Sequence, residues 1–463
     1  MPVSVSARHQ PPYGGAPMDN LSENLLEYIS NHNNLAIGAF FEAHYAIDIA
    51  LALQTLDDQD LEGFCRLVGN EQLARVLEEG SLMLRKRIVD LIDAERIVSV
   101  FTYMSSDDIA DIVGEMPLDQ RKKLLRMMRS SDSQTIENLL GYGPDTAGGN
   151  MTTEYIALRN SLKISEALNK IKMIGPKTEV IEVLFVVNDA NELIGTADLR
   201  DILTTTGDAE LDQITDKNLI AVYPETDQEE VSQLVSKYDL KAIPVINHRN
   251  AILGIITVDD IIDIIVEEYT EDFLMVSGVS KDETIHSTLP ESIRRRLPWL
   301  YVNLAAVLLA SFTVALFEDV IAQVVALAVA MPIVAGLGGN AGFQTLSVVI
   351  RSIALGEVSL HNGWHLVIKE LGLGLIHGLS VGIVAGVILY LKYGNVYLGL
   401  IIVAAMVGNL IIAGLFGYLV PLILRQLNID PAVASSIFVT TATDVFGFFA
   451  FLGLARLFLP YLL

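Results

Sequence analysis

The last third of the chain contains five apolar segments, each long enough to cross a lipid bilayer as a helix. Their residue ranges are 298–317, 320–349, 371–391, 396–424 and 432–463. About twenty apolar residues in a helix span the hydrocarbon core of a membrane. The sequence therefore predicts a multidomain protein in which residues 291–463 form an α-helical transmembrane domain with five helices.

One carboxylate, Asp444, lies inside the last apolar segment. A charge at the centre of a membrane helix costs about 2.5–3.5 kcal/mol on insertion scales, so it needs a compensating partner. On a helix, Thr440 and Thr441 lie one turn before Asp444, and Gly447 lies one turn after it. This face offers oxygen atoms beside a gap and suits a hydrated cation. The alternative is a carboxylate paired with a basic or amide side chain of another helix.

The basic residues predict the orientation in the membrane, because cytoplasmic loops carry an excess of lysine and arginine. Three arginines at positions 294–296 directly precede the first segment. With the N-terminal part in the cytoplasm, six basic residues fall on that side, whereas only Lys392 and Arg456 fall outside. We therefore expect a multi-pass protein of a bacterial-type inner (plasma) membrane, with cytoplasmic soluble domains and an external C-terminus.

The part before the membrane domain is strongly acidic, since residues 1–291 hold 23 basic and 50 acidic side chains. Such a field repels nucleic acid and concentrates cations, so the expected partner is a metal ion or a basic surface. The single cysteine, Cys65, excludes an internal disulfide and a cysteine-based zinc cluster, and fits a reducing compartment. Residues 1–20 are rich in Pro and Gly and are expected to be a disordered tail, not a signal peptide.

Residues 21–145 are predicted to form an all-α helical N domain, because apolar residues recur at helical spacing in short segments. Asp107, Asp108 and Asp111 cluster in one of these segments, with Asp107 and Asp111 one turn apart near its start. The positive end of the helix dipole favours acids at this place. Capping acids on a solvated face are therefore as good an explanation of the spacing as a binding site.

Residues 146–257 contain an internal repeat. In the first copy, residues 186–188 lead to Gly195 and Asp201; in the second, residues 245–247 lead to Gly254 and Asp260. The two glycines are 59 residues apart, as are the two aspartates. Each copy alternates strand-like runs with a helix, so we expect two βαββα units in one α/β module.

This repeat resembles a pair of cystathionine-β-synthase (CBS) domains. The second copy carries Thr257-Val258-Asp259-Asp260, which is similar to the Thr-x-x-Asp motif that holds ribose in nucleotide-binding members. The resemblance implies that a nucleotide such as ATP could bind at Thr257 and Asp260. The first copy has Asp198 at the threonine position. A capping threonine before a helix-starting aspartate is the structural alternative in the second copy.

An acidic connecting helix is predicted to begin near Val258, within residues 258–290. Asp259, Asp263, Glu267 and Glu271 follow one another at four-residue spacing. Like charges at this spacing destabilise a helix by about 0.2–0.5 kcal/mol per pair, so this row favours bound cations. We interpret the helix as a sensor or gate, and a solvated charged face is the alternative. The apolar residues of its other face, which we expect to pack, are Ile261, Ile262, Ile265 and Val266.

The second apolar segment contains a glycine-dense stretch, residues 336–342, which we expect to weaken the helix and expose backbone carbonyls. Asn340 and Gln344 lie one turn apart and present neutral oxygens, either for a hydrated divalent cation or for an interhelical hydrogen bond. Asn409 in the fourth segment is a further candidate. The third segment has glycines at every fourth residue from 374 to 386, which predicts close packing against another helix.

The motif around Asn340, the threonine-rich approach to Asp444 in residues 440–444, and the order of domains resemble the MgtE family of magnesium channels. The resemblance implies a homodimer with one pore, a plug helix, and closure when cytosolic Mg²⁺ is high. It also implies pore positions at Asp444 and Asn340. The regulatory Mg²⁺ ligands it implies are Asp107, Asp111, Asp227, Glu229, Asp239, Asp260, Asp263, Glu267 and Glu268. Family members often carry a proline where this chain has Ile437.

The predicted function is therefore Mg²⁺ uptake through a channel or transporter that cytosolic Mg²⁺ closes. A membrane-anchored metal or nucleotide sensor that transports nothing is one alternative. A proton-coupled carrier of another divalent cation, with Asp444 as the proton relay, is the second. The sequence contains no nucleophile elbow, phosphate-binding glycine loop or His–carboxylate metal cluster, so an enzyme is not expected.

Overall fold

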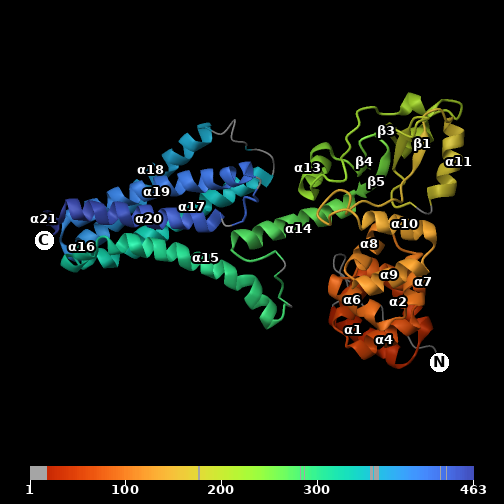
Figure 1. The fold of residues 1–463 in the computed structure, drawn as a ribbon, viewed down its shortest axis with the longest axis horizontal. Helices are drawn as coiled ribbons and strands as arrows, with labels where there is room; N and C mark the ends of the chain where they lie inside the picture. Colours follow the sequence, from red (N-terminus) through yellow and green to blue (C-terminus); the bar gives the residue numbers. More distant parts are fainter. Residues whose placement is uncertain are drawn as a thin grey trace, which may run out of the picture. The chain divides into compact units, whose positions relative to one another are not determined.

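The computed structural model describes residues 18–175, 178–281, 283–285, 287–354, 358, 364–427, 429–433 and 435–463. Most of the predicted tail, residues 1–17, lies outside this description. The chain divides into two compact units, Met1–Ile264 and Ile265–Leu463 (Figure 1).

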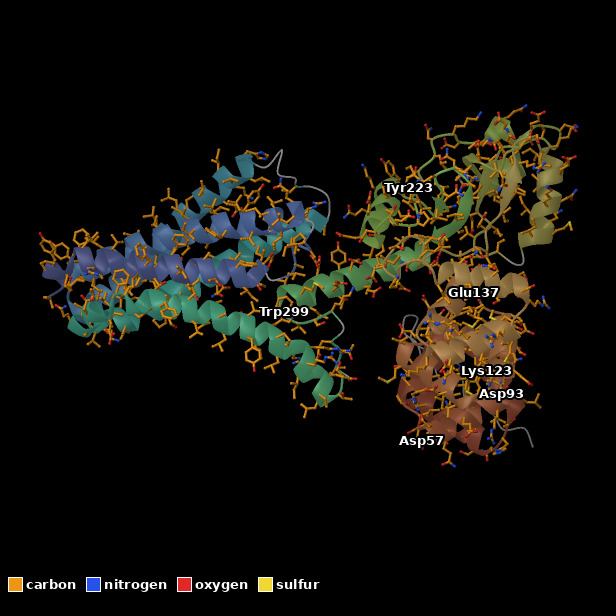
Figure 2. All side chains as sticks on the ribbon, viewed as in Figure 1. Asp57, Asp93, Lys123, Glu137, Tyr223 and Trp299 are labelled. Carbon is orange, nitrogen blue, oxygen red and sulfur yellow. The ribbon has the colours of Figure 1, made fainter. Side chains whose placement is uncertain are left out.

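The first unit begins with a helical domain, as predicted. Its helices are α1 (Met18–Ser30), α2 (Asn34–Ala43), α3 (Ala46–Gln54), α4 (Asp58–Leu67), α5 (Asn70–Glu78), α6 (Leu82–Leu91), α7 (Ala94–Phe101), α8 (Ser106–Gly114), α9 (Leu118–Met127) and α10 (Ser130–Leu139). Several begin at a residue whose side chain accepts a backbone N–H: Asp57 caps α4 and Asp93 caps α7 (Figure 2). Leu61, Phe64 and Leu73 are fully buried in its core.

The α/β module follows with the predicted repeat. Its elements are β1 (Ala157–Arg159), α11 (Ile164–Ile174), β2 (Val183–Val187), β3 (Leu193–Asp198), α12 (Leu199–Thr204), η2 (Leu211–Ile214), α13 (Gln228–Tyr238), β4 (Ala242–Ile246) and β5 (Ile252–Thr257). The antiparallel hairpins β2–β3 and β4–β5 are equivalent, and each turns at an asparagine with positive φ, Asn191 and Asn250. Phe185, Leu193 and Ile255 share one core, so the two copies form a single module.

Helix α14 (Val258–Val276) is the predicted acidic helix. Its apolar face differs from the expectation: Ile261 is buried, whereas Ile262 and Val266 are 56% and 60% exposed. Tyr269 and Phe273 are exposed as well and continue this stripe at helical spacing. The cause is that only the flank around Ile261 and Ile264 meets the α/β core, as the burial pattern shows.

The second unit contains five helices that are long and apolar enough to cross a membrane. They are α15 (Leu289–Ala315), α17 (Ala326–Ala354), α18 (Trp364–Tyr393), α19 (Val396–Gln426) and α20 (Ser435–Leu457). Short helices α16 (Glu318–Gln323) and α21 (Leu459–Leu462) complete it. Apolar side chains cover these helices (Figure 2). The bent pair α2–α3, with 118° between its halves, meets the same composition test if counted as one span.

Glycines bring the membrane helices into close contact. A Cβ atom added at Gly374, Gly378 or Gly386 would lie 2.5–2.7 Å from backbone atoms of α19, which confirms the predicted seam. The expectation for residues 336–342 is wrong, because α17 runs through them as a continuous helix. The missing side chains at Gly338 and Gly342 admit neighbouring helices instead of breaking α17.

Candidate functional site

Two neighbouring membrane helices, α17 and α20, carry the predicted polar residues. Asn340 and Gln344 on α17 and Thr440 on α20 are exposed in the single chain, and Asp444 is half-buried. We call these four residues the polar face. A Cβ atom at Gly339 would lie 3.8 Å from the methyl group of Thr440, so the two helices pack directly at this level. Polar side chains exposed on membrane helices require water, a cation or a second protein surface.

Asp444 has no hydrogen bond or ion pair to any residue that the structure describes. The alternative of a permanent pair with a basic side chain is therefore not seen within those residues. The hydroxyl groups of Thr440 and Thr441 donate to the carbonyl oxygens of Ser436 and Ile437, at 2.7 and 2.6 Å. Each hydroxyl oxygen keeps lone pairs that can accept from the water shell of a cation.

Asn409 does not belong to this face. It is 1% exposed, and its Nδ2 donates to the carbonyl oxygen of Val334 at 2.9 Å inside the helix bundle. The sequence predicted it as an oxygen donor for a cation because its apolar segment gave no indication of which neighbour it meets. It is a buried interhelical residue.

The first unit contains one group of three acids, among the residues described, that is close enough to hold a metal ion. Oxygen atoms of Asp107, Glu179 and Asp260 lie within 4.8 Å of one another. Asp107 comes from the first turn of α8, Asp260 from the first turn of α14, and Glu179 from the segment between α11 and β2. Asp107 Oδ1 is buried and lacks a hydrogen-bond partner among the described residues, so it is available to coordinate a cation. We call these residues the acid cluster.

The electrostatics of the acid cluster favour a proton or a cation on its oxygens. Loss of hydration raises the pKa of Asp107, and the same effect raises that of Asp260 to about 6. Glu179 is exposed on one side, but loss of hydration at its carboxylate and then the charges of Asp107, Asp260 and Glu154 raise its pKa to about 9. An oxygen-only donor set of this charge suits Mg²⁺ or Ca²⁺.

The neighbouring Asp108 has a structural role. It accepts from Arg85 at 3.1 Å and from the hydroxyl of Ser105 at 3.1 Å. Burial and then the charge of Asp107 nevertheless raise its pKa to about 7. Side chains therefore hold Asp108 in place, whereas one oxygen of Asp107 has no hydrogen-bond partner among the described residues.

A hydrogen-bond network beside the acid cluster links the helical domain to the α/β module. Glu154 Oε2 accepts from the hydroxyl of Ser106 at 2.8 Å and from that of Thr152 at 2.5 Å. The backbone N–H of Thr153 donates to the hydroxyl of Ser106 at 3.1 Å. These bonds hold α8, and so Asp107, against the module.

The other predicted acids lie outside the acid cluster. Asp227 caps α13 by accepting from the N–H of Glu229 at 2.9 Å, and Asp239 ends that helix with φ 51°. Asp111 is exposed on α8, and Asp263 and Glu267 are exposed on α14, beside the half-buried Glu268. Farther along α14, Glu271 forms an ion pair with Lys281 at 3.1 Å. Glu271 was not among the predicted ligands, whereas the other acids named here remain candidate ligands.

Thr257 is 2% exposed and donates to Asp260 Oδ2 at 2.5 Å. The residues of the candidate nucleotide motif are thus bonded to each other, and Asp260 is shared with the acid cluster. In the first copy, Asp198 caps α12 by accepting from the N–H of Arg200 at 2.8 Å.

Glu179 was not predicted from the sequence. It lies in a segment without helix or strand periodicity, and no spacing relates it to Asp107 or Asp260. Only the fold, which brings these three distant positions together, identifies it.

The end of α14 contacts the helices that carry the polar face. Val276 packs against a buried cluster formed by Leu346, Ile350 and Val439. Leu346 is two residues after Gln344, and Val439 directly precedes Thr440. A shift of this end of α14 would therefore act on both α17 and α20.

Comparisons with known families match three parts of the chain. Residues 331–454 match a family described as a divalent cation transporter, residues 44–145 match the MgtE intracellular N domain, and residues 211–267 match the CBS domain. The polar face and Asp107 lie within the first two matched regions.

Similar proteins cover most of the chain. The magnesium transporter MgtE of Bacillus subtilis is 33% identical over 356 residues, which are 77% of this chain and 79% of the relative. The magnesium transporter MgtE of Thermus thermophilus is 32% identical over 366 residues, 77% of this chain and 80% of the relative. A crystal structure of the cytosolic domain of the Mg²⁺ channel MgtE in complex with ATP aligns with a TM-score of 0.50 and 26% identity, covering 52% of this chain and 99% of that one.

Proposed function

Because the chain belongs to the MgtE family of magnesium transporters, we propose that it is a Mg²⁺ channel closed by cytosolic Mg²⁺. Members of this family are multi-pass membrane proteins with a cytosolic soluble part, and they are not enzymes. The observation that carries the proposal is the polar face of α17 and α20, with Asp444 unpaired among the described residues of an apolar helix.

Asp444 is the proposed charge that attracts the ion within the membrane. Mg²⁺ gives up water reluctantly and usually keeps several waters around one or two carboxylates. The side-chain oxygens of Asn340, Gln344, Thr440 and Thr441 then accept hydrogen bonds from those waters. Neutral oxygens next to one carboxylate from each copy of the chain hold the ion loosely enough for release, as conduction requires.

Two copies of the chain would complete the pore. The face with Asn340, Gln344 and Thr440 is exposed in one copy, and lipid cannot satisfy these groups. The exposed apolar stripe on α14, with Val266, Tyr269 and Phe273, supports a second copy near this helix as well. We therefore propose a homodimer. The distribution of basic residues favours a C-terminus on the outside.

The acid cluster is the proposed sensor of cytosolic Mg²⁺. With an ion between Asp107, Glu179 and Asp260, the helical domain stays on the α/β module; without it, repulsion between the carboxylates separates them. Helix α14 carries the cluster residue Asp260 in its first turn and ends with Val276 against α17 and α20. It therefore serves as the plug. The other predicted acids, Asp111, Asp227, Glu229, Asp239, Asp263, Glu267 and Glu268, add further cation ligands along the same surfaces.

A nucleotide is the proposed second ligand of the CBS pair. The cytosolic domain of the related Mg²⁺ channel was crystallised with ATP. Ribose binding by Thr257 and Asp260 would replace the hydrogen bond between these two side chains. Since Asp260 also belongs to the acid cluster, ATP and Mg²⁺ would act on the same carboxylate.

Ion flux into proteoliposomes tests the proposed function. We expect Mg²⁺ uptake when Mg²⁺ on the cytoplasmic face is low, and a decrease of about tenfold or more when it rises to millimolar concentration. Empty liposomes are the control. No Mg²⁺ flux at either concentration would favour the non-transporting sensor, and flux that requires a pH gradient would favour the proton-coupled carrier.

A further inference from the structure

Asn409 lies where three membrane helices meet. It is on α19, and its Nδ2 donates to the carbonyl oxygen of Val334 on α17. A Cβ atom added at Gly338 on α17 would lie 2.2 Å from that Nδ2, and one added at Gly447 on α20 would lie 2.7 Å from it. The amide group therefore occupies the space that these two glycines leave open.

The two glycines are close in sequence to the proposed pore residues. Gly338 is two residues before Asn340, and Gly447 is three residues after Asp444. We propose that Asn409 is a positioning residue that sets the separation of α17 and α20, and so the distance between Asn340 and Asp444. This inference rests on the proposed function, because it assigns those helices to the pore.

The bonding of Asn409 argues against a role in stability alone. Its Oδ1 is buried and has no hydrogen-bond partner among the described residues. A buried acceptor without a partner destabilises the folded state, and an apolar side chain of the same size avoids this cost. The amide is better explained by its effect on the positions of two helices. From α19, it forms one hydrogen bond with α17 and contacts α20.

The close fit between the Asn409 amide and Gly338 can be tested by removing side-chain volume at residue 409 and adding it at residue 338. Asn409→Ala removes the amide, and we expect α17 and α20 to shift and Mg²⁺ flux to fall about tenfold. Asn409→Ala with Gly338→Ala returns a methyl group to the vacated space, and we expect it to restore at least half of the flux. Asn409→Ser is the milder version if Asn409→Ala does not fold. Gly408→Ala is the matched control, because a Cβ there meets nothing within 4 Å.

A second readout measures the helix separation without using ion flux. In a Cys65→Ser background, Gly339→Cys with Thr440→Cys places two thiols where Cβ of residue 339 lies 3.8 Å from Cγ2 of Thr440. The side chains at these two positions are therefore in van der Waals contact, which brings the two thiols close enough to react. We expect Asn409→Ala to slow oxidative cross-linking of this pair about tenfold, and the exchange with Gly338→Ala to restore it.

The two readouts separate the possible failures. Unchanged cross-linking and flux in a folded Asn409→Ala protein would overturn the inference, and so would lost flux with unchanged cross-linking, because Asn409 would then act on the ion. The predicted change in cross-linking in a chain that conducts no Mg²⁺ would uphold the positioning role and reject the proposed function.

Discussion

Mg²⁺ flux should fall by about a hundredfold or more when Asp444 is replaced by asparagine. A carboxylate about 4 Å from a unit charge contributes about 4 kcal/mol in a partly screened protein site, and more from a divalent ion. Each 1.4 kcal/mol is a factor of about ten in an equilibrium constant. Asparagine keeps the size of the side chain and removes the charge, so the ion loses this attraction within the membrane.

The Asp444→Asn protein should remain folded, because the native carboxylate has no partner among the described residues and its charge is costly in the membrane. Thermal unfolding in detergent checks this. Asp319→Asn is the matched control: Asp319 is an exposed acid in α16, and its replacement should leave flux unchanged. Full Mg²⁺ flux through Asp444→Asn would remove this residue from the pore.

Neutralising the acid cluster should abolish the response of the soluble part to Mg²⁺. In Asp107→Asn/Glu179→Gln/Asp260→Asn, the carboxylates no longer repel one another and no longer attract the ion. The repulsion is large, since two unit charges about 4 Å apart cost about 4 kcal/mol near a protein surface. We therefore expect the helical domain to stay on the α/β module with or without Mg²⁺, and flux to become independent of Mg²⁺ on the cytoplasmic face.

Hydrogen exchange measures this effect at two backbone N–H groups that bond between α8 and the module. The N–H of Ser106 donates to Glu154 Oε2 at 3.4 Å, and that of Thr153 donates to Ser106 Oγ at 3.1 Å. In the native chain, Mg²⁺ should slow exchange of both about tenfold or more. In the triple variant the difference should nearly vanish.

A matched set of exposed acids supplies the control for this experiment. Asp119→Asn/Asp132→Asn/Glu137→Gln changes the net charge of the helical domain and the module by the same amount, on α9 and α10 and away from the cluster. Its Mg²⁺-dependent protection should equal that of the native chain. Equal protection in the cluster variant as well would mean that other acids sense the ion.

Local patterns predicted the parts of the fold that depend on periodicity. The 59-residue repeat gave the two hairpins, since equivalent alternation of apolar residues forms equivalent strands at β2–β3 and β4–β5. The lengths of the apolar segments gave the five spans. The glycines at 374–386 gave the close packing of α18, because their four-residue spacing puts them on one face.

Features that depend on a neighbour distant in sequence were not predicted. Glycines weaken an isolated helix, but α17 remains continuous because Asn409 and Val439 fill the space beside Gly338 and Gly342. Glu179 joins Asp107 and Asp260 only through the docking of the helical domain on the module. The exposure of Ile262 could not be predicted from hydrophobicity or from spacing, because both faces of α14 carry apolar residues.

Asp444 is proposed to face water inside the membrane and to meet the transported ion there. The reaction of Asp444→Cys, in a Cys65→Ser background, with a charged thiol reagent that does not enter lipid tests this proposal. The reagent should modify residue 444 of the membrane-inserted protein at low Mg²⁺, and Mg²⁺ on the cytoplasmic face should slow the reaction because it closes the pore. A folded protein whose residue 444 stays unmodified at every Mg²⁺ concentration would contradict the proposal.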